Sequence, residues 1–387
     1  MVSLINSNLY STSKSGEYIA VSTLLDRSKT DNKEQLEYPT LLRMGHKYEL
    51  CLGQRLPVGG FYGPLDVSLG SDGWMYVLNR WDNFNGYPRN RYVPVTIEDE
   101  YGEFIFPVID GVPDKRGSEK FPSPVMCEID ENGVLYSTDE HAHSILMLNT
   151  SGDTVGWWGE SGVNDGQLLG PSGIAMDETG DLWIASSQSH KIQKFSRDGS
   201  YIDGWGEFGS DDHQLNHPWG ITLDPIDKSI LVADWRNDLV KRFSVKGELL
   251  QVIGTPGEGE GQLSRPSDVA VDQHGDIYVV DRGNHRVLMF NHRGMFIESF
   301  IGDATMTDKG AQKLLTNPDA LRLRDNVVNL DKEKRFYNPT SIKVDSDGKI
   351  YVVDTGRFRI QIYQKLWRIL EPHEIDAAEL HVDPEVY

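Results

Sequence analysis

Three arginines and three tryptophans stand where short apolar runs begin or end. They are Arg80, Arg236, Arg282, Trp81, Trp219 and Trp235. An arginine guanidinium binds a carboxylate or a phosphate through two parallel hydrogen bonds, and aromatic side chains line many small-molecule pockets. Ion pairs with the many acidic residues, and packing of the tryptophans in the core, are the alternatives. If these side chains converge, they predict a binding site for a small anionic ligand.

His141 occupies the corresponding place in another part of the chain, and histidine titrates near neutral pH. We expect His141 to act as a general acid or base, with Arg80 and Arg236 holding the substrate. It could also bind a divalent metal ion in a central channel, and the sequence identifies no other cofactor. A histidine that only caps or packs a turn is the alternative. His143 differs, because it shares its position with histidines of other repeats, and we interpret it as structural.

Four aspartates recur at the end of an apolar run. They are Asp139, Asp234, Asp281 and Asp354. Carboxylates at such places can perform acid–base catalysis. An acid that returns at one place in most repeats, however, is expected to accept hydrogen bonds from turn amides of its own repeat. We therefore predict a structural role for these aspartates.

The elements that must position these side chains are repeats. Residues 266–287 hold two alternating apolar runs around a polar turn, which is the pattern of a β-hairpin. The pattern returns six times, each time opened by a proline, and three successive spacings are 47 or 48 residues. The opening prolines are Pro64, Pro124, Pro171, Pro218, Pro266 and Pro339. Four strand-like runs per repeat predict an all-β, six-bladed β-propeller.

The two ends of the repeat region complement each other. Residues 48–53 look like the outer strand of a blade that has no inner strands of its own, and no fourth strand follows Tyr363 in the last repeat. We predict that the N-terminal strand completes the last blade and closes the ring. The predicted organisation is an N-terminal extension (1–44), a propeller (45–365) and a C-terminal tail (366–387).

Three short motifs of the fifth repeat carry a resemblance to a known family. They are Pro-x-x-Val-x-Val-Asp from Pro266, Gly-x-Ile-Tyr-Val-x-Asp from Gly275, and Asn-x-Arg-Val from Asn284. The chain resembles the NHL-repeat propellers over about residues 45–365, which implies six blades. Some members, the peptide-amidating lyases, bind zinc through histidines that follow the opening prolines. Here those positions hold Leu65, Val125, Ser172, Trp219, Ser267 and Thr340, so the resemblance to the lyases is distant and does not extend to their zinc site.

Two insertions interrupt the regular spacing. Residues 81–92 lengthen a turn of the first repeat with aromatic and arginine side chains, and residues 303–337 lengthen the loop that leads into the sixth repeat. The first and sixth blades are neighbours in a closed ring. We therefore expect the two insertions to meet over the channel mouth and to form a lid.

Charge and composition exclude several partners. The chain has a formal net charge of −21, which opposes binding to nucleic acid or to an anionic membrane surface. No apolar run approaches the roughly 20 residues of a membrane span, and no secretory signal is recognisable. With only two cysteines, a disulfide framework is not expected. We expect a cytoplasmic protein.

Two classes of function are compatible with this pattern. The first is an enzyme of lyase, hydrolase or isomerase type that acts on a small anionic substrate at the channel mouth, under the two insertions. The second is a non-catalytic propeller that binds a protein or peptide on the same face. An enclosed pocket would favour the enzyme, and an open aromatic surface would favour the binding protein.

Overall fold

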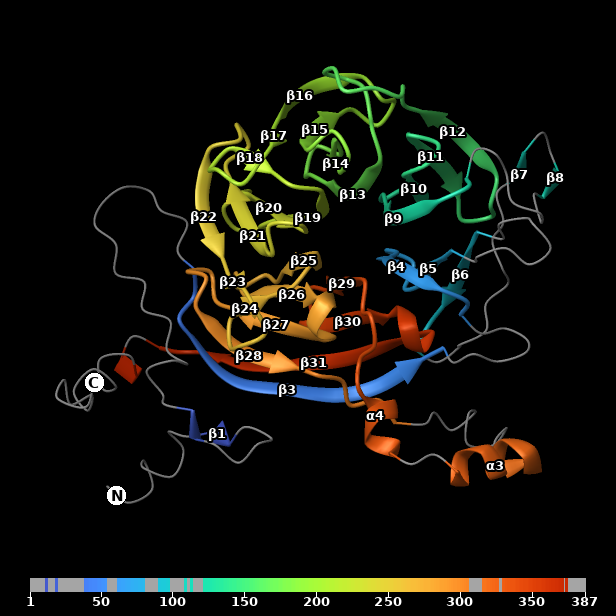
Figure 1. Cartoon of the computed structure of the whole chain (residues 1–387), viewed down its shortest axis with the longest axis vertical. Helices are drawn as coiled ribbons and strands as arrows, with labels where there is room; N and C mark the ends of the chain where they lie inside the picture. Colours follow the sequence, from blue (N-terminus) through green and yellow to red (C-terminus); the bar gives the residue numbers. More distant parts are fainter. Residues whose placement is uncertain are drawn as a thin grey trace.

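The computed structural model describes residues 11–12, 18–19, 38–53, 61–80, 90–97, 108–109, 112–113, 121–305, 315–326, 329–371 and 373–374. These residues form six antiparallel sheets arranged as blades around one axis (Figure 1). The predicted all-β, six-bladed β-propeller is confirmed. Among the described residues, no helix is both long and apolar enough to cross a membrane.

Each blade begins with the strand nearest the axis and continues outward. Blade one contains β4 (Pro64–Leu69), β5 (Met75–Asn79) and β6 (Arg91–Val95). Blade two contains β9 (Pro124–Ile129), β10 (Val134–Asp139), β11 (Ser144–Asn149) and β12 (Thr154–Trp158). Blade three contains β13 (Pro171–Met176), β14 (Leu182–Ser186), β15 (Lys191–Phe195) and β16 (Tyr201–Trp205). Blade four contains β19 (Pro218–Leu223), β20 (Ile230–Asp234), β21 (Leu239–Phe243) and β22 (Leu249–Ile253).

Blade five contains β25 (Pro266–Val271), β26 (Ile277–Asp281), β27 (Arg286–Phe290) and β28 (Phe296–Phe300). Blade six contains β29 (Ser341–Val344), β30 (Lys349–Asp354), β31 (Arg359–Ile369) and β3 (Leu41–Leu52). Short 3₁₀ helices, η1 (Arg282–Asn284) and η2 (Thr355–Arg357), follow the second strands of these blades, and α3 (Pro318–Asp325) and α4 (Leu330–Lys334) precede blade six. The hairpin predicted for residues 266–287 corresponds to β25 and β26.

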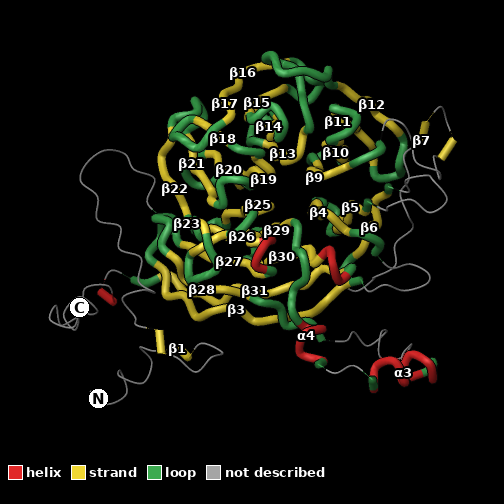
Figure 2. Tube along the Cα trace, viewed as in Figure 1, coloured by secondary structure: helices red, strands yellow, loops and turns green. Residues whose placement is uncertain are grey.

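The remaining strands are two-residue pairs (Figure 2). Two parallel pairs lie in loops between blades: β17 (Glu207–Phe208) with β18 (Gln214–Leu215), and β23 (Thr255–Pro256) with β24 (Gln262–Leu263). Two antiparallel pairs are β1 (Ser11–Thr12) with β2 (Tyr18–Ile19), and β7 (Val108–Ile109) with β8 (Val112–Pro113).

The ring closes in blade six, as predicted. The N-terminal strand β3 pairs antiparallel with β31 from Leu41 opposite Ile369 to Leu52 opposite Ile360. The paired strands extend beyond the apolar run at residues 48–53 and beyond Tyr363. Because β3 covers the free edge of β31, the described part of the last blade has its four strands.

The hydrophobic core is divided among the spaces between blades. Six apolar clusters each join side chains of two neighbouring blades. Between blades five and six, for example, Tyr278 and Phe300 pack with Ile350 and Tyr363. Each fully buried aliphatic or aromatic side chain stabilises the fold by about 1.5–3 kcal/mol relative to an exposed one. Packing between blades therefore fixes the loops at the ends of the strands.

The recurring aspartates bind blade loops, which confirms their predicted structural role. In blade five, Asp281 accepts hydrogen bonds from the backbone N–H of Ser264 at 2.6 Å, from Asn284 Nδ2 at 2.8 Å and from Arg286 Nε at 2.7 Å. Arg286 also donates to Gly259 O and to another loop carbonyl. Backbone N–H groups donate to Asp139, Asp234 and Asp354 in the same way.

His143 also has the predicted structural contact. Its Nδ1 accepts a hydrogen bond of 3.0 Å from the backbone N–H of Gly170, at the start of the next blade. His190 and His285 accept the corresponding bonds from the residues that precede the next opening prolines. In blade four Asp238 replaces histidine and accepts the N–H of Arg265 at 2.6 Å. This position thus links each of these blades to the next.

Candidate functional site

Two tryptophans of blade four lie side by side at the ends of adjacent strands. Trp219 is the second residue of β19, and Trp235 directly follows β20. Their ring centroids are 5.6 Å apart, with the ring planes inclined by 50°. Trp235 Nε1 is buried and has no hydrogen-bond partner, so packing rather than a hydrogen bond holds this ring. The pair forms an aromatic wall.

Two arginines flank the Trp235 ring. The guanidinium carbon of Arg236 lies 5.5 Å from the ring centroid, and that of Arg265 lies 5.6 Å from it. Both distances are within the range of cation–π attraction. Arg236 is the next residue along the chain, whereas Arg265 comes from the loop that leads into blade five. A pocket of about 390 Å³ opens between them, lined by Asn216, Trp235, Arg236, Asp238 and Arg265.

A third arginine lies near Arg265, because the backbone N–H of Gly283, the residue after Arg282, donates to the carbonyl of Ser264 at 2.8 Å. Arg282, in η1 of blade five, is partly buried. Burial lowers its pKa, and the neighbouring charge of Arg265 lowers it further. Among the described residues, no carboxylate forms an ion pair with Arg236, Arg265 or Arg282. The acid of the pocket, Asp238, bonds the backbone of Arg265. Positive charge is therefore concentrated here on a strongly acidic protein.

Two histidines adjoin the aromatic wall. The rings of His190 and His217 are 4.9 Å apart, and the His217 ring lies 6.4 Å from that of Trp235. Burial lowers the pKa of both histidines, and the charge of Arg236 lowers both further. Because each Nδ1 already has a hydrogen-bonding contact, His190 to the backbone of His217 and His217 to Asn216, we assign them a role in shaping the site.

The sequence predicted a structural role for the repeat position of His190 and gave no prediction for His217, Asn216 or Arg265. A signal for two of them was present at the position before the opening proline, which has positive φ in five blades. Glycine or asparagine fills it at Gly63, Gly170 and Asn338. His217 and Arg265, at φ 55° and 49°, adopt the same left-handed conformation. This conformation costs a residue with a Cβ about 1–2 kcal/mol. Blades four and five thus accept strain at the pocket.

The predicted site residues lie in two separate parts of the ring. Arg236, Arg282, Trp219 and Trp235 lie in blades four and five, whereas Arg80 and His141 belong to blades one and two, across the ring in Figure 1. Arg80 donates to Glu140 Oε1 at 2.7 Å and to Ser123 Oγ at 3.2 Å, so it links two blades. Trp81 lies outside the described residues.

The side chain of His141 is exposed, and within the described part of the chain it has no hydrogen bond or ion pair. Only its backbone is held, by an N–H bond of 3.0 Å to Asp139 Oδ1. His141 therefore has no described neighbour that would prepare it for proton transfer.

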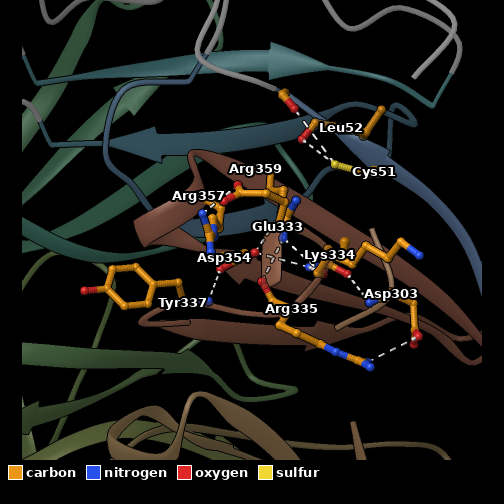
Figure 3. Close-up of polar contacts among 12 residues, drawn as sticks. Cys51, Leu52, Asp303, Glu333, Lys334, Arg335, Tyr337, Asp354, Arg357 and Arg359 are labelled. Atoms are coloured by element: carbon orange, nitrogen blue, oxygen red, sulfur yellow. Dashed lines mark hydrogen bonds and ion pairs between the residues drawn. The ribbon is translucent and has the colours of Figure 1, made fainter. Parts of the chain in front are cut away.

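The described part of the second insertion lies away from the axis. Figure 1 shows α3 and α4 outside the ring, beyond β3. Figure 3 shows how the end of this insertion docks: Arg357 Nη1 donates to Glu333 Oε2 at 2.7 Å, and Arg359 Nη2 donates to the carbonyl of Arg335 at 2.9 Å. These helices do not form the expected lid, because they lie outside the ring and not over the channel mouth. Residues 81–89 and 306–314 lie outside the described residues.

The axis of the ring holds a lysine. Lys343 Nζ, from β29 of blade six, lies 3.1 Å from Glu128 Oε2, from β9 of blade two. Burial alone would lower the pKa of Lys343, but Glu128, Asp66 and Asp268 together raise it. A divalent metal ion in the channel would have to compete with this ammonium group. Among the described residues, no three metal-ligating side chains form a cluster.

Comparisons with known proteins identify the repeat. The NHL repeat matches residues 263–290 and 336–363, which lie in blades five and six. The chain is 29% identical over 131 residues to human NHL repeat-containing protein 3, a match that covers 33% of this chain and 31% of that protein. It is 30% identical over 142 residues to the B-box type zinc finger protein ncl-1 of Caenorhabditis elegans, covering 31% of this chain and 16% of that one.

The matched region thus spans less than a third of either relative. Among solved structures, a streptogramin B lyase aligns with a TM-score of 0.50 at 14% identity, covering 83% of this chain and 98% of the lyase. At this identity the likeness concerns the fold.

Proposed function

Because the chain is a six-bladed β-propeller of NHL repeats, we propose that it is a binding protein that holds an anionic segment of a protein partner between blades four and five. The observation that carries this proposal is the pair of arginines without carboxylate partners that flank Trp235, Arg236 and Arg265, with Arg282 close to Arg265. A carboxylate or phosphate on the partner would supply the missing counter-charge.

The surface character of the pocket supports a protein ligand. Arg236 and Arg265 are exposed, and the pocket opens between two loops. An extended chain can place an acidic side chain against the arginines and an apolar neighbour against Trp235. Tryptophan and arginine are the residue types that most often dominate binding energy at protein interfaces.

The geometry gives less support to an enzyme with His141, Arg80 and Arg236 as catalytic residues. His141 and Arg80 lie on blades one and two, and Arg236 lies on blade four. Arg80 is bound to Glu140 at 2.7 Å, so a substrate would have to displace an existing ion pair. An enzymatic role for these residues therefore needs a rearrangement of loops, whereas binding at blade four needs none.

A direct binding measurement tests the proposal. We expect a fluorescently labelled peptide rich in glutamate to bind, and its lysine-rich counterpart not to bind, in an anisotropy titration. The double variant Arg236→Ala/Arg265→Ala should weaken the glutamate peptide at least tenfold, because two cationic contacts are lost.

Arg197→Ala is the matched control, since Arg197 carries the same charge in blade three but is paired with Glu131 at 3.0 Å. Equal weakening by the control would attribute binding to overall charge. An unaffected double variant, or no binding by the wild-type protein, would refute the proposed function.

A further inference from the structure

We propose that the pocket recognises a phosphoryl group carried by a peptide, as in a phosphoserine, phosphothreonine or phosphotyrosine residue. This inference rests on the proposed function and specifies its ligand. It depends on the charge balance of the pocket, on the contrast with other arginines of the chain, and on the aromatic wall.

The charge of the pocket matches a dianion. Arg236 and Arg265 line the pocket with a single acid, Asp238, and Arg282 lies next to the Gly283–Ser264 backbone bond that precedes Arg265, so the three guanidinium groups leave two positive charges in excess. The buried Asp234 next to the wall does not change this balance, because Lys241 Nζ lies 3.7 Å from it. A phosphomonoester carries a charge of about −1.5 to −2 at neutral pH, whereas a carboxylate carries only one.

The lack of counter-ions distinguishes these arginines from comparable ones. In blades five and six, the arginines that follow the 3₁₀ turns are bound to the recurring aspartates: Arg286 to Asp281 and Arg359 to Asp354, both at 2.7 Å. Arg80, which occupies the same repeat position as Arg282, is bound to Glu140. Arg282 is partly buried and is repelled by the charge of Arg265, so a multiply charged anion would stabilise the site.

The arginines also come from three separate segments. Arg236 follows β20, Arg265 precedes β25, and Arg282 lies in η1. A phosphoryl group offers three strong acceptor oxygens, and clusters of arginine are the usual means by which proteins bind it. A carboxylate offers two acceptor oxygens and one negative charge, so it would neutralise less of the positive charge of the three guanidinium groups.

The surroundings favour a peptide over nucleic acid or free phosphate. The net charge of −21 repels a polyphosphate backbone, which would have to extend beyond the pocket over acidic surface. Trp219 and Trp235 present aromatic surface beside the arginines, against which the residues flanking a phosphorylated side chain can pack. Inorganic phosphate has no flanking residues that could pack against these tryptophans.

Three ten-residue peptides that differ at one central position test the inference. With serine, glutamate or phosphoserine at that position, we expect the phosphoserine peptide to bind at least tenfold more tightly than the glutamate peptide. Arg282→Gln should weaken binding of both acidic peptides but should reduce the preference for phosphoserine at least threefold, because the dianion loses more electrostatic stabilisation than the monoanion does. Arg197→Gln should preserve this preference, and thermal melting should show that each variant is folded.

Each outcome decides a separate question. Equal affinity for the phosphoserine and glutamate peptides would overturn this inference and leave the proposed function intact. If none of the acidic peptides binds, the proposed function fails as well. Tighter binding of inorganic phosphate or of a ten-nucleotide RNA than of the phosphopeptide would overturn the assignment to a peptide.

Discussion

His141 and His143 lie two residues apart on one turn but have different environments. His143 accepts the Gly170 N–H of the next blade, whereas the side chain of His141 is exposed. His143→Ala would leave that N–H without its acceptor, and we expect a loss of about 1–2 kcal/mol in the free energy of unfolding. His141→Ala should change it by less than about 0.5 kcal/mol. Denaturant titration of both variants measures the difference, and equal midpoints would contradict the structural role of His143.

The buried carboxylate of Asp234 gives a prediction about pH. Burial raises its pKa from 3.8 to about 6, although Asn216, Asn237 and Lys241 stabilise the charged form. The folded state therefore binds this proton more tightly than the unfolded state, and the contribution of Asp234 to stability is largest at low pH and falls as pH rises from about 4 to 6.

The comparison with Asp234→Asn isolates this contribution. Relative to the variant, the wild-type protein should lose about 2 kcal/mol of stability between pH 4 and pH 7. Chemical denaturation of both proteins at several pH values measures this difference. A difference that stays constant over this range would show that Asp234 has no raised pKa in the folded state.

The roles of residues that recur in several repeats could be predicted from the sequence, whereas the contacts between residues of different repeats could not. The partners of Asp281 follow from its place in a repeat, because an acid that returns in several blades must serve the blade itself. The bond between Arg80 and Glu140 has no such signal, since the two residues belong to different repeats and only the stacking of blades brings them together. Arg265 has no such signal, because the position before the opening proline holds different residue types in different repeats.

Strands were more predictable than the loops between them. Alternating apolar residues determine which face of a strand is buried, so the blades and the closing strand could be predicted from the sequence. The direction of an inserted loop depends on where its ends are anchored. Arg357 and Arg359 hold the end of the second insertion on blade six, and no periodic pattern of residues 303–337 indicates this.

The closing strand is also fixed by a buried ion cluster outside its own blade. Arg43 of β3 contacts Asp276, in the first turn of blade five, with the shortest distance at 2.6 Å, and Lys365 of β31 lies 2.7 Å from the same carboxylate. We expect Arg43→Ala to lower the free energy of unfolding by about 3 kcal/mol, because it removes one member of a buried cluster.

The matched control is Lys349→Ala. Lys349 Nζ, on β30, lies 3.9 Å from Oε2 of Glu49, which like Arg43 is on β3. This ion pair is partly exposed and lies within blade six. Loss of this ion pair should change the free energy of unfolding by less than about 1 kcal/mol. Denaturation midpoints compare the two variants, and an equal loss would show that the link to blade five adds nothing.

At the scale of the molecule, the positive pocket is opposite in sign to the net charge of the whole chain. The net charge of −21 is a property of the whole chain, while two arginines without carboxylate partners line one pocket and a third, Arg282, lies near Arg265. Composition predicts which polyanions the chain repels, but not where a small region of opposite sign lies. That region depends on Arg265, in the loop that leads into blade five, meeting Trp235 of blade four, and the packing of these two neighbouring blades brings them together.

Ring closure by β3 and β31 can take place only late in synthesis of the chain. During synthesis β3 is made before every blade, and its partner β31 is made after nearly all of them. At about 5–20 residues per second, β3 waits on the order of 15–60 s for its partner. During this interval the nascent chain exposes strand edges that can pair with other chains. Agents that shield such edges should therefore raise the yield of folded protein most when they act during translation.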